Sequence, residues 1–191
     1  VIDQNKLPNS VIDDFEDGDL SEYGSTGGSP NEGGSFTVTS SIDAISGNNT
    51  LNVTTNGASG WYATGSKTLP NTPSQGDRFR FFQRWDTTNS TNSGGLIAYQ
   101  DPTNHIRIGY NAYNSEFVIV VISDSGNNFN SVSKSLSKEK FYEIRGKWYT
   151  DNTIEAKIGE VGYKDGNELA SLSVQDGTYT DGGLGWSGGS Y

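Results

Sequence analysis

Carboxylates crowd a short segment near the start of the chain. Six of them fall within ten positions: Asp13, Asp14, Glu16, Asp17, Asp19 and Glu22. Calcium takes six to eight oxygen ligands in a flexible geometry, and one loop with so many carboxylates can supply several of them. We therefore expect a structural calcium site with Asp14, Glu16 and Asp19 as its ligands. The spacing does not match an EF-hand, and the alternative is a solvated acidic turn.

The arginines form a second group of residues that could do chemistry. There are five of them, Arg78, Arg80, Arg84, Arg107 and Arg145, and all lie opposite the apolar phase of alternating segments. Segments 77–85, 94–100 and 105–111 are joined by short links, so we expect them to be neighbours in one sheet. Their shared, exposed face would carry Arg80, Phe82, Arg84, Gln100, His105 and Arg107.

Such a face is suited to an anionic ligand. Guanidinium groups bind carboxylate or sulfate in bidentate fashion, and an aromatic ring such as Phe82 can stack on a sugar. We therefore predict a ligand-binding face here. The alternative is an ordinary solvated sheet face whose arginine stems cover apolar surface.

The remaining aromatic residues and the single histidine are less specific. Trp61 and Tyr62 lie in a segment rich in turn residues, where exposed rings would form a sugar platform and buried rings would pack in the core. Trp85 and Trp148 occupy apolar positions and are predicted to be core. His105 has no serine or aspartate partner marked by its spacing, so we predict no catalytic residue. Sequons at Asn48, Asn52 and Asn89 would accept glycans in a competent host.

Composition limits the class of protein. The chain has 191 residues, no cysteine, no methionine and a net charge of −10, with an isoelectric point near 4.4. Disulfides and thiolate metal sites are excluded. The charge argues against a nucleic-acid partner, which needs a basic surface. No apolar run approaches the roughly 20 residues of a membrane helix, so we expect no direct membrane insertion. Acidity of this kind is common in exported proteins, and we expect an extracellular or surface-exposed location.

A period of two recurs along the chain, and a helical period does not. It is clearest at 77–85, 105–111, 141–150 and 153–160. Segment 116–122 is apolar on both faces, as in a central strand covered on both sides, and Asp151–Asn152 reads as a hairpin turn. Weaker strands are expected at 11–15, 35–39, 50–54, 60–64, 94–100, 169–174 and 183–186. The sequence therefore predicts a single all-β domain over 1–191, a two-sheet antiparallel β-sandwich, with 1–10 as an N-terminal arm and 24–34 as a surface loop.

Three stretches resemble a known family. They are IDDFEDGDL at 12–20, YEIRGKW at 142–148 followed by TIEAKI at 153–158, and GGLGW at 182–186. The chain is similar in these stretches to concanavalin A-like (laminin-G-like) jelly-roll domains of the lectin and glucanase superfamily, which are found in secreted microbial and viral surface proteins. The resemblance implies a jelly roll and adds support for calcium near the acidic loop. It identifies a fold group and names no ligand.

Two departures from the family pattern bear on function. Family members usually continue past the Gly-Leu-Gly-aromatic strand into one more strand, whereas this chain stops at Tyr191. A final strand could therefore be missing, or a partner could supply it. The alternating carboxylates of the family's glycanases are absent, and the nearest run, Glu143-Ile144-Arg145, lacks the second carboxylate.

The leading functional hypothesis is a non-catalytic carbohydrate-binding or adhesion module that recognises an acidic or cell-surface glycan. The first alternative is a structural or receptor-binding subunit of a virion or cell-surface assembly, in which copies of the chain would oligomerise. The second is a glycan hydrolase or lyase with an unfamiliar site.

Overall fold

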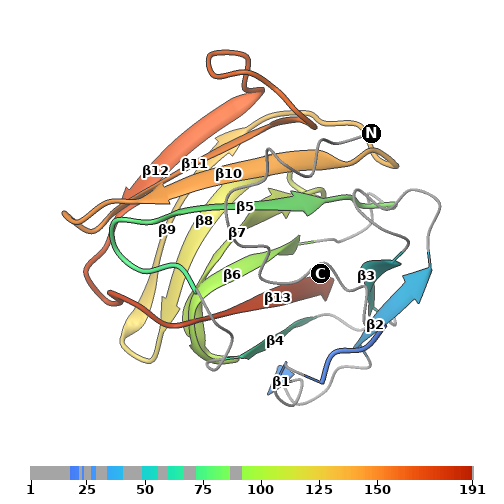
Figure 1. Cartoon of the computed structure of the whole chain (residues 1–191), viewed down its shortest axis with the longest axis horizontal. Helices are drawn as coiled ribbons and strands as arrows, with labels where there is room; N and C mark the ends of the chain where they lie inside the picture. The colour runs from blue at the N-terminus through green and yellow to red at the C-terminus, as the bar shows by residue number, and fades with distance from the viewer. Residues whose placement is uncertain are drawn as a thin grey trace.

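The protein is a β-sandwich (Figure 1). The computed structural model describes residues 18–21, 23, 27–28, 34–40, 49–55, 60–66, 72–86 and 92–190, and in these ranges all regular structure is β. The larger sheet holds, in order, β1 (Gly27–Gly28), β4 (Gly60–Ser66), β13 (Gly183–Ser190), β6 (Asn92–Asp101), β7 (Asn104–Asn111), β8 (Glu116–Ser123) and β9 (Gly126–Ser133). The smaller sheet holds β12 (Ala170–Gln175), β11 (Thr153–Glu160), β10 (Tyr142–Trp148) and β5 (Arg78–Gln83). A separate pair joins β2 (Gly34–Ser40) to β3 (Asn49–Thr55). The described ranges contain no helix that could span a membrane.

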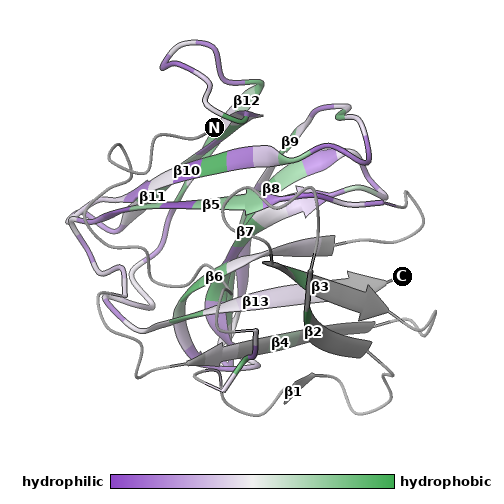
Figure 2. Cartoon of the chain, turned by 45° about the vertical axis from the view of Figure 1, so that its right-hand side comes forward, coloured by the Kyte–Doolittle hydropathy of each residue, from purple (hydrophilic) through white to green (hydrophobic). Residues whose placement is uncertain are grey.

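Alternating apolar positions build the core between the two sheets. Ile106 and Ile108 on β7 meet Ile144 on β10 and Ile158 on β11, and all four are essentially inaccessible to solvent. Trp85 is stacked between Tyr110 and Tyr142, with ring centroids 4.4 and 5.1 Å away. Figure 2 shows the alternation of hydrophobic and hydrophilic residues along β10 that results from burial of one face. The predicted core positions of Trp85 and Trp148 are confirmed.

Most strands expected from the sequence are present. Two of the observed strands, β1 and β9, were not expected, and β1 lies within the segment 24–34 that was predicted to be a surface loop. The expected strand at 11–15 lies outside the described residues. The sequence of β9 is typical of a loop because the positions that face β12 hold exposed asparagines instead of buried apolar residues. Asn128 Nδ2 donates to the Gln175 carbonyl oxygen at 3.3 Å, and Asn130 Nδ2 donates to that of Ser173 at 2.8 Å. Amide side chains therefore join β9 to β12 along one side of the sandwich.

The hairpin between β10 and β11 is confirmed, with one residue more than expected. The N–H of Tyr149 donates to Thr153 and that of Asn152 donates to Tyr149, so the turn holds Thr150, Asp151 and Asn152. Asn152 has a φ of 67°. A type I turn followed by a left-handed residue is a common three-residue hairpin, and asparagine tolerates that conformation better than most residues.

The predicted neighbourhood of segments 77–85, 94–100 and 105–111 is only half right. β6 and β7 pair as expected, but β5 pairs with β10 in the other sheet. Phe81 on β5 faces the larger sheet, since a Cβ added at Gly95 of β6 would meet the Phe81 ring at 3.0 Å. The chain therefore passes from one sheet to the other between β5 and β6, as jelly-roll connections do.

Candidate functional site

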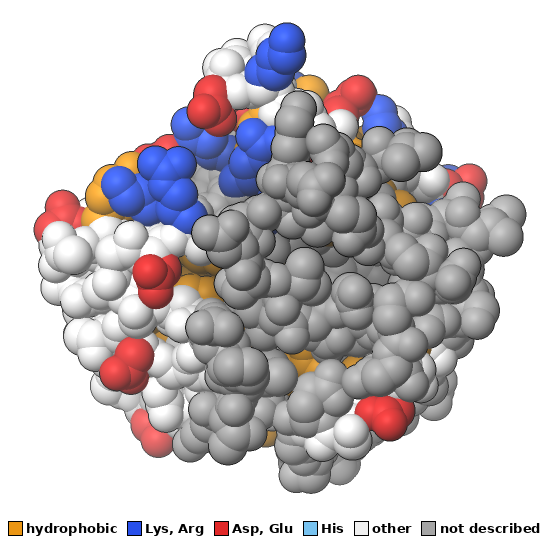
Figure 3. Space-filling model, viewed as in Figure 1, with side chains coloured by type: hydrophobic (Ala, Val, Ile, Leu, Met, Phe, Trp, Pro, Cys, Tyr) orange, Lys and Arg blue, Asp and Glu red, His pale blue; other side chains and the backbone are white. Residues whose placement is uncertain are grey.

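The outer face of the four-stranded sheet carries cations on three adjacent strands. They are Arg78 and Arg80 on β5, Arg145 and Lys147 on β10, and Lys157 on β11, hereafter the cationic face. The strand register places Arg80, Arg145 and Lys157 in one row, and Arg78, Lys147 and Glu155 in the next. In Figure 3 the visible Lys and Arg side chains gather over the part of the molecule that holds this sheet. Like charges on directly opposed residues repel one another, so this arrangement needs support.

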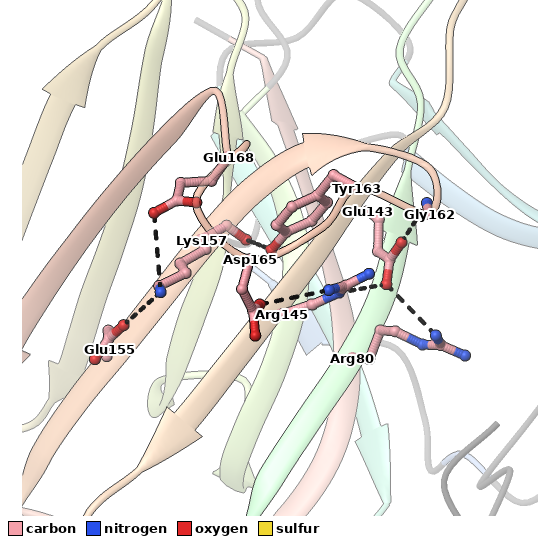
Figure 4. Close-up of polar contacts among 9 residues, drawn as sticks. All are labelled: Arg80, Glu143, Arg145, Glu155, Lys157, Gly162, Tyr163, Asp165 and Glu168. Carbon is pink, nitrogen blue, oxygen red and sulfur yellow. Dashed lines mark hydrogen bonds and ion pairs between the residues drawn. The ribbon is translucent and has the colours of Figure 1, made fainter. Parts of the chain in front are cut away.

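Glu143 supplies part of that support (Figure 4). Its side chain is 1% exposed, and its Oε1 lies 2.7 Å from Arg145 Nε and 3.4 Å from Arg80 Nη1. Its Oε2 accepts the N–H of Gly162 at 2.6 Å. Burial raises the pKa of Glu143, but the hydrogen bonds from Arg145 and Gly162 and the two guanidinium charges outweigh burial and leave the pKa below its usual value. One carboxylate thus fixes two arginines and leaves the face net positive.

Aromatic rings contact two cations of the face, Lys147 and Arg145. Lys147 Nζ lies 4.0 Å from the centre of the Tyr149 ring, and the Arg145 guanidinium lies 4.1 Å from that of Tyr163. A ring face attracts a cation through its quadrupole and leaves the charge available to a ligand. Within the described residues, Arg78 and Lys147 form no ion pair. The row that they share is therefore the part of the face with the most available positive charge.

A shallow depression of about 360 Å³ continues the cationic face across β11 and β12. Its lining offers hydroxyl, carboxylate and aromatic groups, from Tyr149, Asp151, Thr153, Glu155, Ser171, Leu172 and Ser173. Tyr149 donates to Glu155 Oε2 at 3.0 Å, a bond that raises the pKa of Tyr149. The register sets Ser171 opposite Lys157 and Ser173 opposite Glu155, so both cationic rows run into the depression. Groups of these types bind the hydroxyls and ring faces of sugars.

The structure divides the predicted binding face between the two sheets. Arg80 and Phe82 lie on the outer face of β5, with the Arg80 guanidinium 5.4 Å from the Phe82 ring centre. Arg84 follows β5 and pairs with Asp86 at 2.8 Å. Gln100, His105 and Arg107 lie on β6 and β7 of the other sheet, and Gln100 donates to the Asp181 carbonyl oxygen at 3.4 Å. The six residues do not form one surface.

His105 and Arg107 are also not exposed, contrary to the prediction. Their side of β7 is buried, since His105 is 0% and Arg107 7% exposed, and Leu96, paired with Arg107, is 1% exposed. The alternation was assigned correctly, but the outer face of the larger sheet is itself covered here, so its polar phase is not solvated. Burial lowers the pKa of His105 to about 4, so the ring is neutral at pH 7, stacked on Tyr99 at 6.3 Å. Neither residue is available as a ligand contact on a free surface.

Only some of the other predicted site residues lie within the part of the chain that the structure describes. The backbone of Trp61 and Tyr62 lies in β4, while their side chains fall outside the described residues. Asp14 and Glu16 also lie outside them. Asp19 is exposed and accepts the N–H of Ser21 at 2.8 Å, which lowers its pKa. Within the described ranges no group of three or more acidic or histidine side chains is placed to hold a metal, and the calcium site stays a prediction.

Sequence reasoning missed four of the five cations of this face as site residues: Arg78, Arg145, Lys147 and Lys157. The polar phase of 142–148 contains Glu143, Arg145 and Lys147, so the charges were visible. The missing information was that β10 pairs with β5. One signal pointed to it: Gly146 interrupts the inner phase of β10, and an added Cβ there would overlap the ring of Phe79 on β5. A glycine opposite a large ring indicates that the two strands are neighbours.

Comparisons with known proteins agree on the fold. The carbohydrate-binding module CBM66 from Bacillus subtilis matches with a TM-score of 0.56 and 11% sequence identity, over 82% of this chain and 88% of that one. A protein of unknown function from Shewanella oneidensis MR-1 matches with a TM-score of 0.51 and 13% identity, over 90% of this chain and 74% of that one. No family model matches the chain, and no curated protein does. The protein therefore has a jelly-roll-like β-sandwich fold that a carbohydrate-binding module shares.

Proposed function

We propose that the protein is a non-catalytic carbohydrate-binding module that holds the anionic groups of an acidic glycan on the cationic face, while the adjoining depression, lined by Asp151 and Glu155 as well as hydroxyl groups, can contact only uncharged sugar hydroxyls. The observation that carries the proposal is the row of Arg78 and Lys147, neither of which forms an ion pair with a described carboxylate, although Glu155 lies opposite Lys147 in that row. The fold shared with a carbohydrate-binding module supports a sugar ligand. The resemblance of the sequence to concanavalin A-like lectins supports the same class and a surface-exposed parent protein.

The charge of the whole molecule sharpens the choice of ligand. With a net charge of −10, the protein repels a polyanion at long range. Screening limits that repulsion to about 8 Å at physiological salt, so a local concentration of cations can still bind one. Five of the 13 lysines and arginines lie on this single sheet face. This local concentration of cations favours an anionic ligand.

The test uses matched polymers with and without charge. We expect dextran sulfate, but not dextran, to retard the protein in affinity electrophoresis, and likewise polygalacturonate but not its methyl ester. Replacement of Arg78 and Lys147 together by alanine should weaken binding of the charged polymers at least about tenfold, because charge-assisted hydrogen bonds contribute roughly 1.5–3 kcal/mol each.

The charge-matched control is the double variant Lys138→Ala with Lys140→Ala. The side chains of both lysines are about half exposed, at 54% and 45%. Lys138 pairs with Glu139 in the segment before β10, and Lys140 pairs with Glu160 at the end of β11. This variant should bind nearly as well as the wild type. Equal binding of dextran and dextran sulfate, or equal weakening by both double variants, would reject the cationic face as the site.

A further inference from the structure

The loop between β11 and β12, residues 161–169, brings its own carboxylates to the cationic face. Asp165 Oδ1 lies 3.8 Å from Arg145 Nη1, and Glu168 Oε1 lies 3.9 Å from Lys157 Nζ (Figure 4). Both cations belong to the row that also contains Arg80. The loop therefore offers to this row the same chemical group that an acidic glycan would offer.

The base of this loop is held more firmly than its tip. The N–H of Gly162 donates to Glu143 at 2.6 Å, and that of Leu169 donates to the Ile158 carbonyl oxygen at 2.8 Å. At the tip, the Asp165 side chain is 90% exposed and its ion pair is long. Exposed pairs of this kind contribute little to stability.

Glu168, next to the base, is held to the cationic face by a single long ion pair. Its own backbone N–H and that of Gly166 lower its pKa, so the carboxylate is charged at neutral pH, and its side chain is 22% exposed. A polyanionic ligand can therefore replace the two long ion pairs of the loop, at 3.8 and 3.9 Å, while Gly162 and Leu169 keep the base in place.

We propose that Asp165 and Glu168 act as an internal competitor for Arg145 and Lys157, so that the site selects densely charged, polyanionic glycans. This inference rests on the proposed function. A sugar with one isolated charge can use Arg78 and Lys147 but gains too little to displace the tip. A glycan with closely spaced carboxylates or sulfates replaces both loop carboxylates at once and then binds to the cations of both rows.

The test removes the competitor. We expect the double variant Asp165→Asn with Glu168→Gln to bind dextran sulfate about 3- to 10-fold more tightly than the wild type, measured by titration calorimetry at one fixed salt concentration. The charge-matched control is Glu139→Gln with Glu160→Gln. These glutamates pair with Lys138 and Lys140, away from the cationic face, so this control should tighten binding by less than about twofold. Melting temperatures of both variants check that the fold is intact.

The outcomes separate the two proposals. If neither the wild type nor the variants bind dextran sulfate, the proposed function fails. If the wild type binds but both double variants gain equally, the gain is long-range electrostatics and the competitor is rejected. A second readout is the preference for dextran sulfate of high over low substitution. The ratio of the two affinities should become smaller in Asp165→Asn with Glu168→Gln and stay unchanged in the control. A ratio that stays unchanged in both variants would also overturn the inference.

Discussion

Burial of His105 decides its protonation state and gives the stability of the protein a pH dependence. The unfolded histidine takes up a proton near pH 6.5, whereas burial lowers the pKa of the folded one to about 4. Between these two values the unfolded chain binds more protons, so stability falls as the pH falls from 6.5 towards 4.

We expect His105→Gln to remove this part of the pH dependence. Between pH 7.5 and pH 5 the wild type should lose about 2 kcal/mol of unfolding free energy through His105 alone. Urea unfolding at the two pH values measures it. The variant can be less stable at both, but its loss between them should be smaller by that amount. An identical loss would show that His105 is protonated in the folded protein.

Glu143 acts in a lower pH window. Its lowered pKa means that its contribution is present above the usual value of 4.5 and is lost as the pH falls through the folded value. We expect Glu143→Gln to cost about 1.5–3 kcal/mol at neutral pH, because the amide cannot replace the charge-assisted bonds to Arg80 and Arg145. Glu160→Gln, at an exposed glutamate, should cost less than about 0.5 kcal/mol. Denaturant melts at pH 7 compare them, and equal stability of the two variants would contradict this role for Glu143.

At the scale of strands, close approach between β6 and β7 makes a specific demand for glycine. Gly94 and Gly109 are paired in the register, and a Cβ added at Gly109 would overlap the carbonyl oxygen of Ser93. Backbone atoms cannot move aside as a side-chain end can. We expect Gly109→Ala to destabilise the fold by about 1–3 kcal/mol.

The matched control is Gly177→Ala, in the exposed link between β12 and β13. An added Cβ there would lie 3.4 Å from Asn152 Nδ2, an ordinary contact. Thermal melts of the two variants measure the difference. If Gly177→Ala proves as destabilising as Gly109→Ala, the close approach of the two strands is not what limits position 109.

Strands that bury one face in the core could be predicted from the sequence. A strand that contacts the other sheet through polar side chains could not. β5, β7, β10 and β11 alternate because one face of each enters the core. β9 does not alternate in this way, since the exposed Asn128 and Asn130 occupy the positions that face β12 and donate to its backbone. No pattern of hydropathy distinguishes such a strand from an asparagine-rich loop.

At the scale of the whole molecule, the sandwich and its core were predictable, whereas the grouping of the charged residues was not. The phase of each arginine followed from local alternation. Which strands lie side by side depends on where the chain crosses between sheets, and the short link after β5 gave no sign of a crossing. The covered outer face at His105 and Arg107 is likewise a property of the assembled sheet. The candidate site depends on the pairing of β5 with β10, which local alternation does not reveal.

The asparagine bridge between β9 and β12 has a consequence for aggregation. An edge strand normally exposes carbonyl oxygens that can recruit a strand from another molecule. Along β12, the carbonyl oxygens of Ser173 and Gln175 point away from β11 and already accept amide groups from β9. An incoming strand would have to break these bonds before it could pair. The edge of the smaller sheet at β12 is thus protected against pairing with a strand from another molecule.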